Sequence, residues 1–212
     1  GEARREMLPT TYSFAMTYLG GRVQVNQNVA LNAVVTFQTR LVTTRLRNSQ
    51  GAPLDTGAAE YYAGIWRAFG TTQGGEVSRE LLPISYSFAM TYEGGRIQAT
   101  QDVSANPVVT FQTREVVVGL RSSANLPLDG GIVEYYAGSW RPFGTTAAGE
   151  ARKELLPTSY SFAVRWAGGR FQLMQNVATS PSVVFQTGAV LSDSGTCTSY
   201  YATSWKPFAQ GI

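Results

Sequence analysis

Glu150 and Glu154 come nearest to a general acid–base pair, because two carboxylates lie four positions apart on a predicted strand. The same spacing recurs earlier in the chain, at Glu2 and Glu6 and at Glu76 and Glu80. Residues four apart on a strand share a face and lie about 13 Å apart. Glycosidase carboxylates lie roughly 5 to 9.5 Å apart, so this spacing does not predict hydrolysis. Basic residues alternate with the glutamates, at Arg5, Arg79 and Lys153, which is typical of a solvated strand that resists edge-to-edge aggregation.

Other residues that carry catalysis or bind metals are sparse. The chain has no His and one cysteine, Cys197, which excludes a Ser-His-Asp triad, a Cys/His zinc site and an intramolecular disulfide. Cys197 aligns with Ile132 and Ala58, which predicts a buried apolar role. The aspartates lack calcium-loop spacing, at Asp55, Asp102, Asp129 and Asp193. We interpret the arginines after the Gly-Gly pairs as solvated turn charges rather than an anion site: Arg22, Arg96 and Arg170. The sequence therefore predicts no enzymatic activity, no cofactor and no metal.

Repeated aromatic pairs are candidates for stacking against sugars. Two adjacent tyrosines precede a tryptophan at Tyr61, Tyr62 and Trp66, at Tyr135, Tyr136 and Trp140, and at Tyr200, Tyr201 and Trp205. Adjacent strand residues point to opposite faces, so only one tyrosine of each pair can lie in a core. Two interpretations stay open for the other aromatics: they cover a domain end and the joint beside it, or they contact glycan. The candidate glycan contacts are Tyr62, Trp66, Tyr136 and Trp140.

A repeat of 74 residues organises all of these positions. The segment Leu155–Val164 has close counterparts at Met7–Met16 and Leu81–Met90, and Tyr12, Tyr86 and Tyr160 are spaced 74 residues apart. A fixed long period indicates a tandem array. A unit of this length is small, but it can bury a workable core.

Within one repeat, alternating apolar and polar residues predict seven strands and no helix. In the repeat from Arg114 they are expected at 115–120, 132–136, 140–143, 150–156, 160–166, 171–177 and 183–185. Tyr160 and Phe162 share one face of the fifth strand while small polar residues share the other, so one face is core. Gly168-Gly169 marks a tight hairpin. This pattern predicts a two-sheet antiparallel sandwich with Phe88, Phe111 and Val118 in the cores.

The joints define the expected domains. The seventh strand of one unit runs into the first strand of the next without a Gly, Pro or Ser spacer, which predicts complete domains at 40–113 and 114–187 in a stiff rod. Residues 1–39 contain only strands four to seven, and residues 188–212 contain only strands one to three. The two halves are complementary, with the cut in the turn between strands three and four.

The motif Tyr-Tyr-Ala-Gly-x-Trp-Arg-x-Phe-Gly-Thr-Thr, followed by Glu-Leu-Leu-Pro-x-x-Tyr-Ser-Phe, resembles the tandem repeats of large bacterial secreted and cell-surface proteins. Those repeats are similar to the prealbumin-like, collagen-adhesin B-type immunoglobulin-like sandwiches. The resemblance implies an all-β tandem immunoglobulin-like fold, extracellular or cell-surface display, and an adhesion or stalk role. Many B-type domains contain a Lys–Asn or Lys–Asp isopeptide bond. Here Lys153 is matched by Arg79 and Arg5, which cannot form that bond, so no such cross-link is expected.

Composition limits the partners. The net charge is +3 and no run of Lys or Arg is dense, so neither nucleic acid nor a membrane surface is predicted. No apolar stretch approaches the length of a membrane span, which predicts no membrane insertion. Residues 1–6 do not have the pattern of a signal peptide.

The half-domains predict that the partner is a second copy of the chain. Each half alone exposes an apolar face and unpaired strand edges, which head-to-tail strand addition between chains removes. We expect a structural filament or surface stalk, and the alternative is a multivalent carbohydrate-binding module. A ring and a fragment of a longer array also stay open. The expected contact joins Tyr12, Phe14, Val35 and Phe37 of one subunit to Val190, Tyr200, Tyr201, Trp205 and Phe208 of the next.

Overall fold

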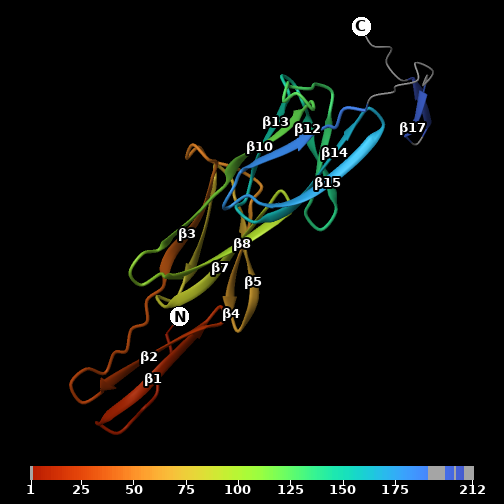
Figure 1. The fold of residues 1–212 in the computed structure, drawn as a ribbon. Coiled ribbons are helices and arrows are strands. Elements are labelled where there is room, and N and C mark those ends of the chain that lie inside the picture. Colours follow the sequence, from red (N-terminus) through yellow and green to blue (C-terminus); the bar gives the residue numbers. More distant parts are fainter. Residues whose placement is uncertain (1, 191–198, 203, 208–212) are drawn as a thin grey trace. The chain divides into compact units, whose positions relative to one another are not determined.

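The computed structural model describes residues 2–190, 199–202 and 204–207, and all of its regular elements are strands (Figure 1). The predicted all-β fold is confirmed for these residues. None of them forms a helix long and apolar enough to cross a membrane. The chain divides into two compact units. The first comprises the chain up to Leu46 with Pro53–Met90 and Gln98–Phe111, and the second comprises Arg47–Ala52, Thr91–Ile97 and the chain from Gln112 onward.

Residues 40–113 form a three-stranded and a four-stranded sheet. The strands are β3 (Arg40–Arg47), β4 (Ala58–Ala63), β5 (Ile65–Thr71), β6 (Glu76–Leu81), β7 (Ser85–Tyr92), β8 (Gly95–Asp102) and β9 (Val108–Gln112). The sheet orders are β6-β3-β9 and β5-β4-β7-β8. The first strand in sequence is therefore the middle strand of the smaller sheet.

Residues 114–187 repeat this arrangement. The strands are β10 (Arg114–Arg121), β11 (Ile132–Tyr136), β12 (Trp140–Thr145), β13 (Glu150–Leu155), β14 (Ser159–Trp166), β15 (Gly169–Asn176) and β16 (Ser182–Gln186). The sheet orders are β13-β10-β16 and β12-β11-β14-β15. The first strand, β10, again lies in the middle of three.

The pair β10 and β16 departs from the expected antiparallel sandwich. β10 and β16 are parallel, with Val118 opposite Val183 and Leu120 opposite Phe185, whereas β10 and β13 are antiparallel. Parallel neighbours need a long crossover connection, and here the chain passes through five other strands between them. The expectation of a wholly antiparallel sandwich is therefore wrong for this pair.

Steeply inclined aromatic pairs fill both cores in the same way. In the first unit Tyr86 packs against Tyr61 and Phe88, with ring centroids 5.8 and 6.2 Å away. In the second unit Tyr160 packs against Tyr135 at 5.8 Å and Phe162 at 6.1 Å. Such pairs add to the free energy of burying the rings themselves. The predicted core residues are confirmed, because Phe88, Phe111 and Val118 are 0%, 2% and 0% exposed.

Residues 2–39 contain only β1 (Thr11–Tyr18) and β2 (Gly21–Asn28), which pair as an antiparallel hairpin (Figure 1). The predicted fourth strand at 2–8 and seventh strand at 35–37 are absent, so these two predictions are wrong for the described chain. The reason lies in the sheet order, since both strands would pair with a first strand. Residues 2–39 contain no first strand, and backbone groups without a partner do not form a ladder.

Residues 199–207 contain β17 (Ser199–Ala202) and β18 (Ser204–Pro207), which pair in antiparallel register. Tyr201 lies opposite Trp205, as Tyr136 lies opposite Trp140 in the preceding repeat. Val190 is exposed and lies in no strand. Asp193, Cys197 and Phe208 lie outside the described residues, as does the side chain of Trp205.

Truncating a core ring tests this strand register. Phe111→Ala should lower the free energy of unfolding by about 3–5 kcal/mol, because it removes a buried ring and leaves a cavity. Leu41 lies on β3 of the same unit and is 58% exposed. Leu41→Ala should therefore change the free energy of unfolding by less than about 0.5 kcal/mol. Denaturant titration of both variants measures the difference. A loss below about 1 kcal/mol for Phe111→Ala would contradict the register.

Candidate functional site

The hairpin turns between the fifth and sixth strands have one geometry. Leu19-Gly20, Glu93-Gly94 and Ala167-Gly168 form the two-residue loops, and φ is positive at each of these six residues. Positive φ at both central residues defines a type I′ turn, which matches the twist of the flanking strands. The tight hairpin was predicted, but Gly169 is not a loop residue: it pairs with Trp166 at the start of β15.

A tyrosine hydroxyl donates a hydrogen bond to the first loop residue of each of these turns. Tyr61 donates to the Leu19 carbonyl at 3.0 Å, and Tyr135 donates to the Glu93 carbonyl at 3.0 Å. At the third turn Tyr200 donates to the Ala167 carbonyl at 2.6 Å. These carbonyls belong to loop residues outside the strand ladders, so a tyrosine from the next repeat satisfies a group that its own hairpin leaves open.

The glycine after each turn decides how closely the next repeat approaches. A Cβ at Gly21 would lie 2.2 Å from the Tyr86 hydroxyl oxygen, and a Cβ at Gly95 would lie 2.0 Å from the Tyr160 hydroxyl oxygen. No side chain is compatible with either distance. The core tyrosine on the fifth strand of one repeat therefore seats against the hairpin of the preceding repeat.

Charge reinforces the cap at the Glu93 turn. The Glu93 carboxylate accepts from Tyr135 at 2.9 Å and forms an ion pair with Lys153 at 3.3 Å. Burial, followed by the hydrogen bond to Glu93, raises the pKa of the Tyr135 hydroxyl. Leu19 and Ala167 occupy the matching turn positions, so the carboxylate contact is specific to this turn.

Glu154 makes a second contact set in the second unit. Its carboxylate accepts from the Ser49 backbone N–H at 3.1 Å, and also from the Ser49 and Thr113 hydroxyls. Gln112 orders the same loop by donating to the Asn48 and Ser49 carbonyls at 3.1 and 3.2 Å. We call this set the glutamate clamp.

The interpretation of Glu154 as a solvated charge is thus wrong, while Glu150 behaves as a surface charge. Glu154 is half-buried and bonded to a loop that lies 105 positions away in sequence. Glu150 instead forms ion pairs with Arg121 at 3.0 Å and Arg152 at 2.8 Å. The identical Glu spacing gave no signal that distinguishes the two, because the partners of Glu154 are remote.

The candidate glycan residues form edge-on pairs. Tyr62 meets Trp66 with ring centroids 5.5 Å apart at 64°, and Tyr136 meets Trp140 at 5.6 Å and 66°. Tyr62 and Tyr136 are exposed, as the alternation predicted. The Arg170 guanidinium carbon lies 4.3 Å from the centroid of the Trp140 ring. Steeply inclined rings, one of them covered by an arginine, make a poor flat platform for a sugar, and glycan contact stays a prediction.

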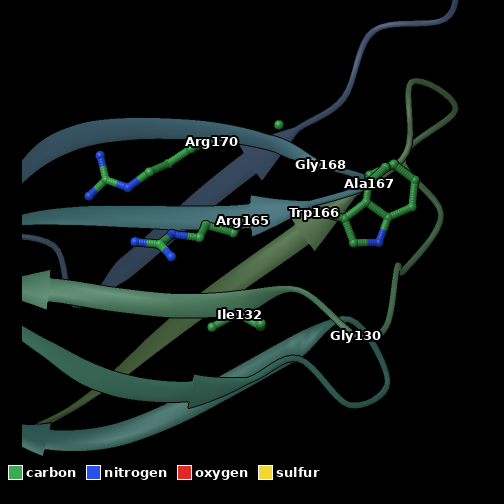
Figure 2. Close-up of a pocket in the computed structure, with 8 residues that line it drawn as sticks. Gly130, Ile132, Arg165, Trp166, Ala167, Gly168 and Arg170 are labelled. Atoms are coloured by element: carbon green, nitrogen blue, oxygen red, sulfur yellow. The ribbon is translucent and has the colours of Figure 1, made fainter. Parts of the chain in front are cut away.

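An open depression lies beside the third turn. It has a volume of about 470 Å³ and is lined by Gly130, Ile132 and the hairpin residues from Arg165 to Arg170 (Figure 2). Trp166 closes one side by donating to the Asp129 carbonyl at 3.1 Å. Among the described residues no group of His, Cys, Asp or Glu is arranged to hold a metal ion.

No protein-family model and no curated protein matches this chain. The solved structures that are distantly similar in fold include the following three. The Bacillus anthracis TIE protein is 11% identical with a TM-score of 0.33, covering 84% of this chain and 40% of that chain. A streptococcal ancillary pilin is 12% identical with a TM-score of 0.26, covering 70% of this chain and 62% of that one. A shaft pilin from Lactobacillus rhamnosus GG is 10% identical with a TM-score of 0.26, covering 73% and 100%.

Removing the glutamate clamp should destabilise the second unit. Glu154→Ala leaves the Ser49 and Thr113 hydroxyls without this acceptor, so the free energy of unfolding should fall by about 1–3 kcal/mol. Glu115→Ala is the control, because Glu115 forms an exposed ion pair with Arg152 worth less than about 1 kcal/mol. Chemical denaturation compares the variants, and equal losses would show that the clamp contributes nothing.

Alkaline pH should destabilise the fold through its buried tyrosines. Burial, followed by the charge of Tyr61, raises the pKa of Tyr86 to about 12. An unfolded tyrosine titrates near 10, so this contribution is complete below about pH 10 and is lost as the pH rises towards about 12. Each such group adds a slope of about 1.4 kcal/mol per pH unit. Unfolding titrations from about pH 8 to about pH 12 should show this decline, with a shallower slope for Tyr86→Phe.

Proposed function

We propose that this protein is a structural, non-enzymatic repeat subunit of an extracellular or cell-surface filament. Neighbouring subunits complete each other's split β-sandwich head to tail. In this proposal 40–113 and 114–187 are complete 74-residue, seven-stranded repeats, 1–39 is the C-terminal half of a repeat, and 188–212 is the N-terminal half. The observation that carries the proposal is the open apolar face of the β1–β2 hairpin.

The apolar face of this hairpin carries the residues of a core strand, but they are not fully buried. Tyr12 and Phe14 are half-buried, whereas their counterparts Tyr86 and Phe88 are buried. Met16 is 41% exposed, whereas the matching Met90 is fully buried. Leaving these side chains in water is unfavourable by about 25 cal/mol for each Å² of apolar surface, so a covering layer is strongly favoured.

A second copy carries the strands that would complete both sheets of this repeat. The hairpin β17–β18 has the pairing of β11–β12, and β11 pairs with β14 so that Tyr135 lies opposite Phe162. Applied to the split repeat, the same register sets β17 of one subunit beside β1 of the next, with Tyr200 opposite Phe14. The chain from Gly188 would supply the missing first strand between residues 2–8 and 35–37.

The resulting contact set is the one expected from the sequence. On the accepting side, Val35 and Phe37 are half-buried outside any strand and would join a ladder. On the donating side, Val190 is exposed and would become covered as the matching Val116 is, while Tyr201 matches the exposed Tyr136. The full set is Tyr12, Phe14, Val35 and Phe37 against Val190, Tyr200, Tyr201, Trp205 and Phe208. Since the contact joins different surfaces and does not close on itself, it generates a filament.

Self-assembly tests the proposal. Sedimentation and electron microscopy of the intact chain at rising concentration should reveal a ladder of oligomers that grows into filaments. A chain without residues 188–212 keeps the accepting face and should stay monomeric, as should a chain without residues 1–39. Mixing the two truncated chains should give a one-to-one complex and nothing longer. An intact chain that remains a compact monomer at high concentration overturns the proposal.

A further inference from the structure

No contact within its own chain requires a glycine at position 169. A Cβ at Gly169 would approach only the Trp166 carbonyl oxygen, at an ordinary 3.6 Å. Its φ lies outside the left-handed region that favours glycine. Any small side chain would fit there. At the two equivalent positions, Gly21 and Gly95, a tyrosine hydroxyl fills that space.

The repeat identifies the tyrosine that is missing. Tyr86 seats against Gly21 and Tyr160 seats against Gly95, each on the fifth strand of the repeat that follows the turn. The fifth strand that follows Gly169 in the head-to-tail arrangement is β1 of the next subunit. Its matching residue is Tyr12, which is only half-buried in its own hairpin.

We infer that Gly169 is the seat for the Tyr12 hydroxyl of a second copy of this chain. The inference rests on the head-to-tail filament proposed above and adds the residue pair that sets its closest approach. The donating hairpin is already in place, since Tyr200 of the same chain caps the Ala167 carbonyl at this turn. The open depression around Ala167 and Gly168 leaves the seat accessible (Figure 2).

The same subunit contact has a second unfilled site, which is the counterpart of the glutamate clamp. Gln186 donates to the Ser122 and Ser123 carbonyls at 3.3 and 3.4 Å, as Gln112 does to the Asn48 and Ser49 carbonyls in the glutamate clamp. The Thr187 N–H donates to the Arg121 carbonyl at 2.9 Å, as the Thr113 N–H does to the Arg47 carbonyl. The loop at Ser122 and Ser123 is therefore already held as the loop of the glutamate clamp is.

The carboxylate that matches Glu154 for this second loop is Glu6 of the next copy. The side chain of Glu6 is 95% exposed in its own chain, where it forms a surface ion pair with Arg4 at 3.6 Å that it would exchange for the clamp. Ser123 and Thr187 would then hold Glu6 as Ser49 and Thr113 hold Glu154. The same subunit contact thus fills both the space beside Gly169 and this second clamp.

Substitution at the seat tests the inference. Gly169→Ala sets a Cβ where the Tyr12 hydroxyl must lie, so the concentration for half-assembly should rise by more than about tenfold while the thermal midpoint of the unassembled chain is unchanged. Gly144→Ala is the control, because Gly144 is also an exposed strand glycine of this sandwich with only an ordinary Cβ contact, and assembly should be unaffected. Gly95→Ala should lower the thermal midpoint, because Tyr160 occupies that seat within the chain.

A second substitution separates a lost contact from a damaged fold. Tyr12→Phe removes the oxygen that meets the new Cβ, so the double variant Gly169→Ala with Tyr12→Phe should recover much of the lost assembly. If the wild-type chain assembles and the Gly169→Ala variant assembles equally well, the inferred contact between Tyr12 and Gly169 is wrong, but the filament proposal is unaffected. A Gly169→Ala defect that Tyr12→Phe does not relieve also overturns the seat. A wild-type chain that does not assemble overturns the filament proposal and this inference together.

Discussion

The middle position of the first strand is the constraint on which each sandwich depends. β10 pairs with β13 along one edge and with β16 along the other, so the two outer strands exist as strands only when β10 lies between them. The hairpins of the repeat are different, because each finds its partner within a few residues. Residues 2–39 show both outcomes: the local hairpin β1–β2 forms, while the segments that need a middle strand stay irregular.

The seam between repeats uses contacts of another kind. It consists of single polar and steric matches: a tyrosine hydroxyl on a turn carbonyl, a glycine that admits a tyrosine, and a glutamate held by a serine and a threonine. Such contacts contribute less free energy than the cores, but they require particular geometry. Tyr160 serves both purposes, since its ring belongs to the core of its own repeat and its hydroxyl oxygen meets the preceding hairpin.

In the proposed filament, the boundary between subunits falls in the turn between strands three and four of one repeat. It leaves each half with an intact hairpin, β17–β18 on one side and β1–β2 on the other. An isolated two-stranded hairpin is marginal in water, so in the proposed filament each half would gain most of its stability on meeting its complement. Alternating charges on the fourth-strand segment, Glu2 to Glu6, discourage pairing with unrelated strand edges.

Much of the fold could be read from the sequence, because alternation and turn residues are local signals. The alternation of Tyr160, Phe162 and Val164 located a core strand, and the repeat extended that assignment to Tyr86 and Phe88. The double glycine marked the hairpin to within one residue. The adjacent tyrosines were likewise separated correctly into a buried member, Tyr135, and an exposed one, Tyr136.

Only the tertiary structure decided which remote groups meet. It made β10 and β16 parallel neighbours and left residues 2–8 and 35–37 without strand structure. It also distinguished Glu154 from Glu150, although every repeat contains two glutamates with this spacing. The deciding partners are remote in sequence, since Val118 pairs with Val183 and Ser49 lies 105 positions from Glu154. Period-2 patterning says which face a residue occupies but not what lies opposite it.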